Sequence, residues 1–204
     1  QMQPLELYIH IPFCVKKCAY CDFLSGPAGE KEKEEYVKML VDEIRNCPDA
    51  VQDYRVVSIF FGGGTPSLLT GEQIGRLMDT VREIFTLDED AEITMEMNPG
   101  TVTEEKLRRY RQAGVNRLSI GLQSVNDEEL RLLGRIYTYE EFLEAYHLAR
   151  ANGFSNINVD LISAIPGQTV ESWRRTLEHV MALSPEHISA YSLILEEGTP
   201  FYKK

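Results

Sequence analysis

Three cysteines stand close together near the amino end of the chain, in the pattern Cys14-x-x-x-Cys18-x-x-Cys21. Thiolates this near to one another on a single loop can hold a soft metal ion or an iron–sulfur cluster. A cluster of four irons with three cysteine ligands leaves one iron open for further chemistry. A structural zinc site with His10 as the fourth ligand also fits the pattern. Cys47 stands apart, and we expect it to be an unremarkable thiol at a helix end.

A glycine-rich stretch offers a second kind of chemistry. Gly62-Gly63-Gly64-Thr65-Pro66 follows an apolar run. Three glycines present bare N–H groups and allow close backbone approach, which suits a carboxylate, amine or phosphate, although they can also form a mere turn. No Gly-Lys-Ser/Thr follows, so the stretch is not a Walker loop.

Alternating strand and helix patterns must position these motifs. We expect strands at 5–11, 55–61, 91–97, 116–121, 157–162 and 186–193, and helices at 32–45, 71–85, 105–113, 127–133, 139–152 and 170–183. Capping boxes are expected at Thr70 with Gln73, Thr101 with Glu104 and Thr138 with Glu141. The polar stretch 25–35 predicts a mobile surface segment. Six strands with helices between them predict a parallel sheet with right-handed crossovers.

The unusual polar residues stand near the carboxyl ends of these strands. The cysteine loop follows the first strand and the glycine stretch follows the second. The later strands end near Glu96 and Asn98-Pro99, Gln123-Ser124, Asp160 and Ser192. Ligands of parallel α/β folds bind at this edge, so we expect one site there. Taken alone, Glu96 could equally be a half-exposed carboxylate, and Arg135 is expected to be a solvated helix end.

Composition and charge exclude several classes of protein. The 204 residues carry a net charge of −11, which argues against a nucleic-acid surface. No apolar run approaches the length of a membrane span, and the apolar stretch 5–13 is too interrupted to be a signal peptide. The four cysteines are unevenly spaced, unlike a secreted disulfide framework, so we expect a cytoplasmic protein.

Taken together, the motifs resemble those of the radical S-adenosylmethionine (SAM) superfamily. More narrowly, the chain resembles the family of oxygen-independent coproporphyrinogen III oxidase and the haem chaperone HemW. The matching stretches span nearly the whole chain and are Tyr8-Ile-His-Ile-Pro-Phe-Cys14, Cys18-Ala-Tyr-Cys21-Asp-Phe23, Phe60-Phe-Gly-Gly-Gly-Thr-Pro-Ser67, Glu96-Met-Asn-Pro99, Gly121-Leu-Gln-Ser124, Leu133-Gly-Arg135, Asn158-Val-Asp-Leu161 and Ile165-Pro-Gly-Gln-Thr169. The resemblance implies an open (β/α)6 barrel, a partial TIM-like fold.

The resemblance also implies cofactors and their ligands. Three irons of a [4Fe–4S] cluster would be bound by Cys14, Cys18 and Cys21. The fourth iron would take the amino and carboxylate groups of SAM, whose methionine part would meet Gly63, Gly64 and Thr65. The family's other SAM-contacting positions correspond to Tyr8, Tyr20, Glu96, Gln123, Arg135, Asp160 and Ile194. The chemistry implied is reductive cleavage of SAM to methionine and a 5′-deoxyadenosyl radical.

Two departures from the family pattern bear on function. The oxidase branch carries a further cysteine where this chain has Phe23, and Cys-Asp-Phe is the HemW-like pattern. The family's usual histidine after the Gly-Arg pair is here Tyr137, so a role borrowed for that histidine does not carry over. The leading expectation is a haem chaperone that passes haem to haem proteins. The alternatives are the oxidase, which decarboxylates two propionates to vinyls, and a structural zinc module.

The resemblance also implies binding partners and the extent of the domain. Expected partners are SAM, haem or a porphyrin, a one-electron donor protein and a peripheral membrane protein that receives haem, without nucleic acid. The family continues into a C-terminal domain, so we expect residues 1–204 to be the radical SAM core alone. We expect this core to cleave SAM slowly but not to convert coproporphyrinogen III. We also expect valine at Gly63 to weaken SAM binding while leaving the fold intact.

Overall fold

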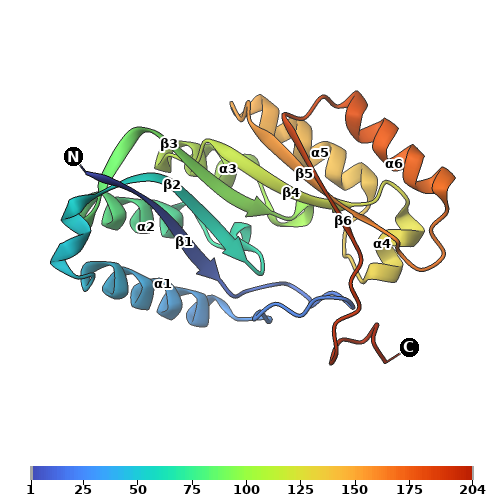
Figure 1. The fold of residues 1–204 in the computed structure, drawn as a ribbon, viewed down its shortest axis with the longest axis horizontal. Coiled ribbons are helices and arrows are strands. Elements are labelled where there is room, and N and C mark those ends of the chain that lie inside the picture. Colours follow the sequence, from blue (N-terminus) through green and yellow to red (C-terminus); the bar gives the residue numbers. More distant parts are fainter. Residues whose placement is uncertain (1, 204) are drawn as a thin grey trace.

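Six parallel strands form one curled sheet in the computed structural model, which describes residues 2–203. Gln1 and Lys204 of the expected domain lie outside the described residues. The strands are β1 (Gln3–Ile11), β2 (Tyr54–Gly63), β3 (Thr86–Met97), β4 (Arg117–Gln123), β5 (Ile157–Ser163) and β6 (His187–Ser192). They lie in sequence order, so β1 and β6 are the two edges of an open half-barrel (Figure 1). The expected open (β/α)6 fold is confirmed.

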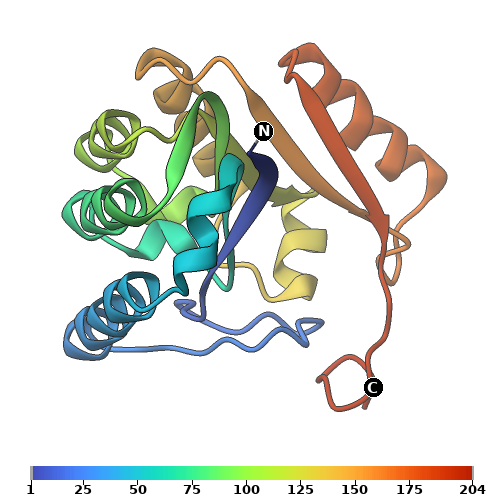
Figure 2. The same cartoon turned by 60° about the vertical axis from the view of Figure 1, so that its left-hand side comes forward.

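Helices connect successive strands and cover the outer face of the sheet (Figure 2). They are α1 (Glu30–Arg45), α2 (Gly71–Ile84), α3 (Glu104–Ala113), α4 (Asp127–Leu133), α5 (Tyr139–Ala151) and α6 (Val170–Ala182). The connection from β4 to β5 holds two helices, of which the short α4 follows directly on the end of β4. No helix among residues 2–203 has both the length and the apolar character needed to cross a bilayer.

Each face of the sheet has its own chemistry. On β4, Leu118, Ile120 and Leu122 are fully buried toward the helices, while the alternate residues Arg117 and Ser119 line the inside of the half-barrel. A parallel sheet with helices on both faces has apolar residues on both. Here only the convex face packs into the core, whose largest buried side chains include Tyr110, Tyr146, Phe61, Phe142 and Phe154. The concave face keeps polar side chains and is free to bind a ligand.

The expected helix caps agree with the structure at α2 and α5 but not at α3. The capping boxes expected at α2 and α5 are confirmed. The box expected between Thr101 and Glu104 is wrong, because α3 begins at Glu104 and is capped by Thr103, whose hydroxyl accepts from the Lys106 N–H at 3.2 Å. Thr101 instead ends a 3-10 turn and donates its hydroxyl to the Asn98 carbonyl at 2.7 Å.

Two further boundaries differ from expectation. The stretch 25–35 is not one mobile segment, because α1 already begins at Glu30 and the Gly29 N–H donates to the Glu32 carboxylate at 2.8 Å. Strand β3 begins at Thr86, ahead of the expected residue 91, because its first residues pair with the start of β2. The first residues of β3 are largely charged, so an apolar pattern does not predict them as a strand.

Candidate functional site

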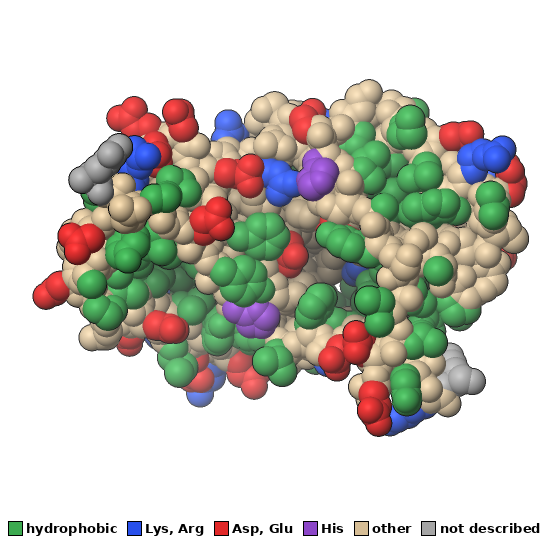
Figure 3. Space-filling view, viewed as in Figure 1, with side chains coloured by type: hydrophobic (Ala, Val, Ile, Leu, Met, Phe, Trp, Pro, Cys, Tyr) green, Lys and Arg blue, Asp and Glu red, His purple; other side chains and the backbone are tan. Residues whose placement is uncertain are grey.

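A cavity of about 800 Å³ extends from the carboxyl ends of the strands down the inner face of the half-barrel. Figure 3 shows it as a hollow with hydrophobic side chains gathered around its rim. The sequence-predicted site residues that line it are Cys14, Cys18, Tyr20, Cys21, Gly63, Gly64, Thr65, Glu96, Gln123, Arg135, Asp160 and Ile194. Tyr8 does not line it, but it stacks on Phe60, which does, with 6.2 Å between ring centroids. The predicted residues thus converge on one place.

Backbone hydrogen bonds hold the cysteine loop against three other segments. The Cys14 N–H donates to the Gly26 carbonyl at 3.0 Å, which ties the start of the loop to its return. Midway, the Ala19 N–H donates to the Leu133 carbonyl at the end of α4, at 3.1 Å. The Ala19 carbonyl accepts from the N–H of Phe201, beyond β6. The loop therefore crosses the mouth of the cavity from the β1 side to the β6 side (Figure 1).

The donor set of this loop fits an iron–sulfur cluster, although the thiols do not stand as a ready-made ligand set. All four cysteines are free, and within residues 2–203 no three Cys, His, Asp or Glu side chains are arranged to hold a metal ion. Burial raises the pKa of the Cys18 thiol, while Arg135 beside it opposes the rise. Iron binds the thiolate, so ligation would displace the proton and draw the sulfurs together.

His10 is not free to act as a metal ligand. Its Nε2 lies 3.1 Å from the Leu24 carbonyl, which can only accept, so Nε2 carries the hydrogen. Its Nδ1 lies 3.0 Å from the Tyr8 hydroxyl and accepts from it. Both ring nitrogens are occupied, which argues against the zinc site with His10 as the fourth ligand.

Arg135 lies beside the cysteine loop with an unsatisfied donor. Its guanidinium carbon lies 5.8 Å from the Tyr20 ring centroid and 5.5 Å from that of Tyr137. Its Nε is buried without a hydrogen-bond partner in the described part of the chain. The interpretation of Arg135 as a solvated helix end is therefore wrong. A buried charged donor without a partner costs free energy, and an anionic group such as the SAM carboxylate would accept a hydrogen bond from it.

The aromatic neighbours of Arg135 are neutral phenols. Burial raises the pKa of Tyr20 to about 12, although the Arg135 guanidinium lowers it in part. Tyr137 is buried and donates its hydroxyl to the Gly121 carbonyl on β4. The position where the family usually has histidine thus fixes the backbone of β4 rather than offering a base.

The glycine stretch packs its backbone against the segment that leads into the cysteine loop. The Gly64 N–H donates to the Ile11 carbonyl at 2.9 Å, and the Gly63 N–H donates to a Glu96 carboxylate oxygen at 3.1 Å. Gly63 has φ +120°, and a Cβ there would lie 2.8 Å from the Ile11 carbonyl oxygen. The expectation that valine at Gly63 leaves the fold intact is therefore wrong.

We expect alanine at Gly64 to destabilise the protein. A Cβ there would clash with the Phe13 carbonyl oxygen, so the backbone must shift, at a cost of about 1–3 kcal/mol. Gly75, inside α2, is the matched control, because a Cβ there meets nothing within 4 Å and alanine should stabilise the helix by about 0.5–1 kcal/mol. Urea unfolding measures both changes. Equal midpoints for the two variants would contradict the close packing of this loop.

Two carboxylates face the middle of the cavity. Asp160 accepts from the Ser119 hydroxyl at 3.0 Å and from the Asn158 amide at 2.8 Å, which fixes its orientation. Burial raises the pKa of Glu96 to about 7; the Gly63 N–H opposes this rise and the Asp160 charge adds to it. Two acidic groups in one cavity favour a cationic ligand, such as the sulfonium group of SAM.

The side chains of the adjacent residues Gln123 and Ser124 lie on different sides of the sheet at the end of β4. Gln123 has φ +73° and turns into the cavity, whereas Ser124 is buried behind the sheet and donates its hydroxyl to Glu129 at 2.5 Å. The absence of a side chain at Gly121 lets the polar groups around it converge. A Cβ there would lie 3.1 Å from the Gln123 amide nitrogen and 3.5 Å from an Arg135 Nη.

Sequence analysis missed a second set of polar residues that line the cavity. These residues are Arg117, Ser119, Asn158, His187 and Ser189, all on inner faces of β4, β5 and β6. The signal that could have found them is alternation, because each occupies every second position among apolar neighbours. Attention to the ends of the strands alone passes over their inner faces.

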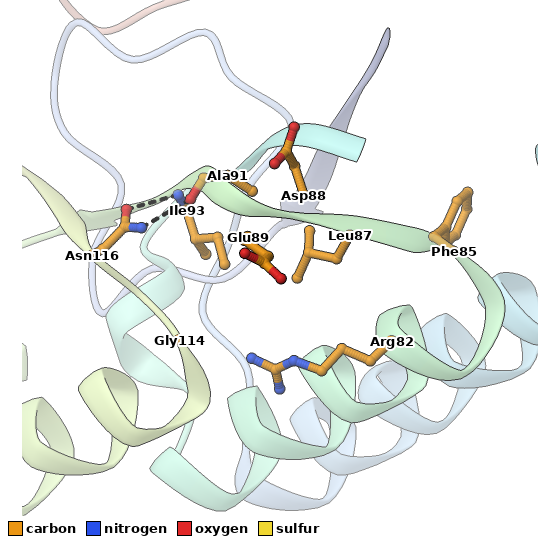
Figure 4. Close-up of a pocket in the computed structure, with 9 residues that line it drawn as sticks. All are labelled: Arg82, Phe85, Leu87, Asp88, Glu89, Ala91, Ile93, Gly114 and Asn116. Atoms are coloured by element: carbon orange, nitrogen blue, oxygen red, sulfur yellow. Dashed lines mark hydrogen bonds between the residues drawn. The ribbon is translucent and has the colours of Figure 1, made fainter. Parts of the chain in front are cut away.

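A smaller cavity of about 470 Å³ lies at the opposite end of the sheet, between α2 and the start of β3 (Figure 4). Three of its polar side chains already have partners: Asp88 pairs with Arg55 at 3.1 Å, and Asn116 and Arg82 are hydrogen-bonded. Asn116 bridges the Ile93 N–H and the Ala91 carbonyl, each at 2.9 Å. Arg82 donates to the Ala113 carbonyl at 2.7 Å. These contacts hold α2, β3 and the end of α3 together, and we assign the cavity no ligand.

Comparison with known proteins gives a consistent result. The model of the Radical SAM superfamily matches residues 8–180. The heme chaperone HemW of Escherichia coli (strain K12) is 45% identical over 202 residues, which are 98% of this chain and 53% of that protein. The mitochondrial Radical S-adenosyl methionine domain-containing protein 1 of Danio rerio is 37% identical, over 98% of this chain and 45% of that protein. The chain thus spans about half the length of these curated relatives.

Among solved structures, coproporphyrinogen III oxidase (HemN) from Escherichia coli superposes with a TM-score of 0.87 at 37% sequence identity. The match covers 95% of this chain and 45% of that one. Methylornithine synthase (PylB) superposes with a TM-score of 0.65 at 15% identity, which shows a shared fold alone.

Proposed function

This chain belongs to the radical SAM superfamily, in the family that holds HemW and the oxidase HemN, and from that premise we propose that it is a HemW-like haem chaperone that binds a [4Fe–4S] cluster and SAM. The observation that carries the proposal is the convergence of the cysteine loop, the glycine stretch and two carboxylates on one cavity. The family implies the cluster and SAM, and the HemW relatives suggest haem as a further ligand.

The chain's own residues would bind and orient these groups. Cys14, Cys18 and Cys21 would supply three thiolates, and the unpartnered Nε of Arg135 would face an anion close to them. The bare backbone at Gly63 and Gly64 would leave room for the methionine part of SAM. When bound, the cluster and SAM supply one-electron reductive cleavage of the sulfonium.

Two carboxylates would bind the positively charged part of SAM. Asp160 is held in place by Ser119 and Asn158, so its carboxylate needs no reorganisation on binding. Glu96 takes its hydrogen bond from Gly63 and keeps one carboxylate oxygen for a cationic ligand. Preorganised groups of this kind favour a charged ligand without an ordering cost at the moment of binding.

The rim of the cavity supports a tetrapyrrole as the second ligand. Large apolar side chains are exposed around the mouth, among them Val15, Phe23, Leu24, Tyr191, Ile194 and Leu195. A contiguous apolar surface beside a polar cavity is typical of a binding site for a flat, largely apolar molecule with polar substituents. Phe23, 68% exposed, adds to this surface at the position where the oxidase branch has a cysteine.

We expect the anaerobically reconstituted chain to bind haem and to form no protoporphyrinogen from coproporphyrinogen III. The physical reason is orientation, because decarboxylation requires a substrate carbon held against the reactive centre and the apolar rim supplies surface rather than fixed contacts. Haem binding is measured by absorbance titration, and turnover by following 5′-deoxyadenosine and protoporphyrinogen with dithionite and SAM. Protoporphyrinogen formed in step with 5′-deoxyadenosine would establish the oxidase instead. Absence of haem binding would refute the chaperone.

A further inference from the structure

The inner face of the half-barrel is sorted by charge along the strands. Asp160 is level with Gly121 of β4 and Ser189 of β6 in the strand register. Arg117 lies four residues before Gly121 on the same face of β4, which places it about 13 Å deeper at the usual strand rise. Glu96 is level with Ser119, two residues above Arg117, so Arg117 lies deepest of the three charged residues and the lower end of the cavity suits an anionic group.

Arg117 has no anionic partner of its own. One Nη lies 2.8 Å from Nδ1 of His187 and the other lies 3.4 Å from the Thr94 hydroxyl. Unlike Arg76 and Arg150, which pair with Glu34 and Glu186, it makes no ion pair within 4.0 Å in the described part of the chain. A half-buried arginine that lines a cavity without a counter-ion is disposed to bind an anion.

His187 makes the floor a pair of donors. Because Arg117 can only donate, Nδ1 of His187 accepts and Nε2 carries the hydrogen. The neighbouring side-chain amide of Asn158 is already engaged. The Asn158 carbonyl oxygen accepts from the Ser189 hydroxyl at 3.0 Å, and the Asn158 amide donates toward Ser119 and Asp160. The guanidinium of Arg117 and the Nε2–H of His187 are donors that suit a carboxylate.

We propose that Arg117 and His187 form a carboxylate-binding site at the floor of the half-barrel. The site takes the carboxylate of a second ligand that shares the cavity with SAM. The identity of that ligand rests on the proposed function: for haem or a porphyrin, the group is a propionate. The apolar ring would lie toward the exposed rim, and one propionate would reach inward to the floor.

The test compares haem with haem dimethyl ester, whose propionates carry no charge. Three reconstituted proteins are titrated: wild type, Arg117→Met and the control Arg174→Met. Arg174 lies on α6, its side chain is 63% exposed, and its ion pair with Glu171 is 3.9 Å long. We expect wild type and the control to bind haem about tenfold or more tightly than the diester, and Arg117→Met to bind the two alike. Equal affinity of the wild type for both pigments overturns the floor site while leaving haem binding intact.

A second measurement separates failure of the site from failure of the proposed function. If wild type binds neither pigment, the haem proposal fails, and the floor is then probed with sodium propionate against sodium chloride at equal ionic strength. Propionate should raise the melting temperature of wild type and Arg174→Met but not of Arg117→Met. An equal shift in all three proteins, or a shift in none, overturns the carboxylate site.

Discussion

Replacing Cys18 with alanine is expected to remove the iron from the anaerobically reconstituted protein, whereas Cys47→Ala is expected to retain about four irons per chain. Cys18 lies on the loop that crosses the cavity mouth, and a cluster held by three thiolates loses its anchorage with any one of them. Cys47 follows α1 before the start of β2, at the amino ends of the strands, and its thiol contacts the Glu43 carbonyl at 3.7 Å.

Iron, sulfide and zinc contents are measured together, with circular dichroism to confirm that each variant is folded. Cys14→Ala and Cys21→Ala should behave as Cys18→Ala does. Loss of iron from Cys47→Ala to the same extent would contradict the ligand assignment. Stoichiometric zinc in a colourless wild type would restore the structural zinc module, despite the engaged nitrogens of His10.

The affinity for SAM is expected to rise about tenfold between pH 6 and pH 8. Burial raises the pKa of Glu96 to about 7, so the carboxyl is largely protonated at the lower pH. A cationic ligand binds the ionised form, so each binding event below the pKa must first expel a proton. With a pKa near 7, the apparent dissociation constant for SAM exceeds its value for the fully ionised carboxylate by a factor of about 11 at pH 6 and about 1.1 at pH 8.

Calorimetry in two buffers of different ionisation enthalpy detects the expelled proton directly. Glu96→Gln is the matched variant, because it keeps the shape and an acceptor for the Gly63 N–H but does not titrate. It should bind SAM more weakly at pH 8 and lose the part of the pH dependence that belongs to this carboxyl, leaving that of SAM itself. Identical pH profiles for wild type and Glu96→Gln would remove Glu96 from the site.

The part of the site at the carboxyl ends of the strands could be predicted from sequence, because its position depends only on the order of strands and motifs along the chain. A motif that ends a parallel strand must lie at the same edge as its neighbours, so the cysteine loop, the glycine stretch and Glu96 could be placed together before their contacts were known. The cavity lining agrees with that placement. The assignment of these residues to SAM and the cluster remains a prediction.

The rest depends on contacts that no local pattern contains. Arg135 follows a short helix and looks solvated in sequence, but the packing of Tyr20 and Tyr137 buries its Nε. Thr101 has the spacing of a capping box, yet Thr103 forms the cap. The floor pair of Arg117 and His187 joins residues far apart in the chain, and only the curvature of the sheet brings them together.

The central claim is that three cysteines of this loop hold a cluster whose remaining iron is open to SAM. Electron paramagnetic resonance of the reduced, reconstituted protein, recorded without and with SAM, tests it most directly. We predict a [4Fe–4S]⁺ signal that changes on addition of SAM in wild type and is absent from Cys18→Ala. A wild-type signal that SAM leaves unchanged, or no iron signal in a protein that holds zinc, would contradict the account.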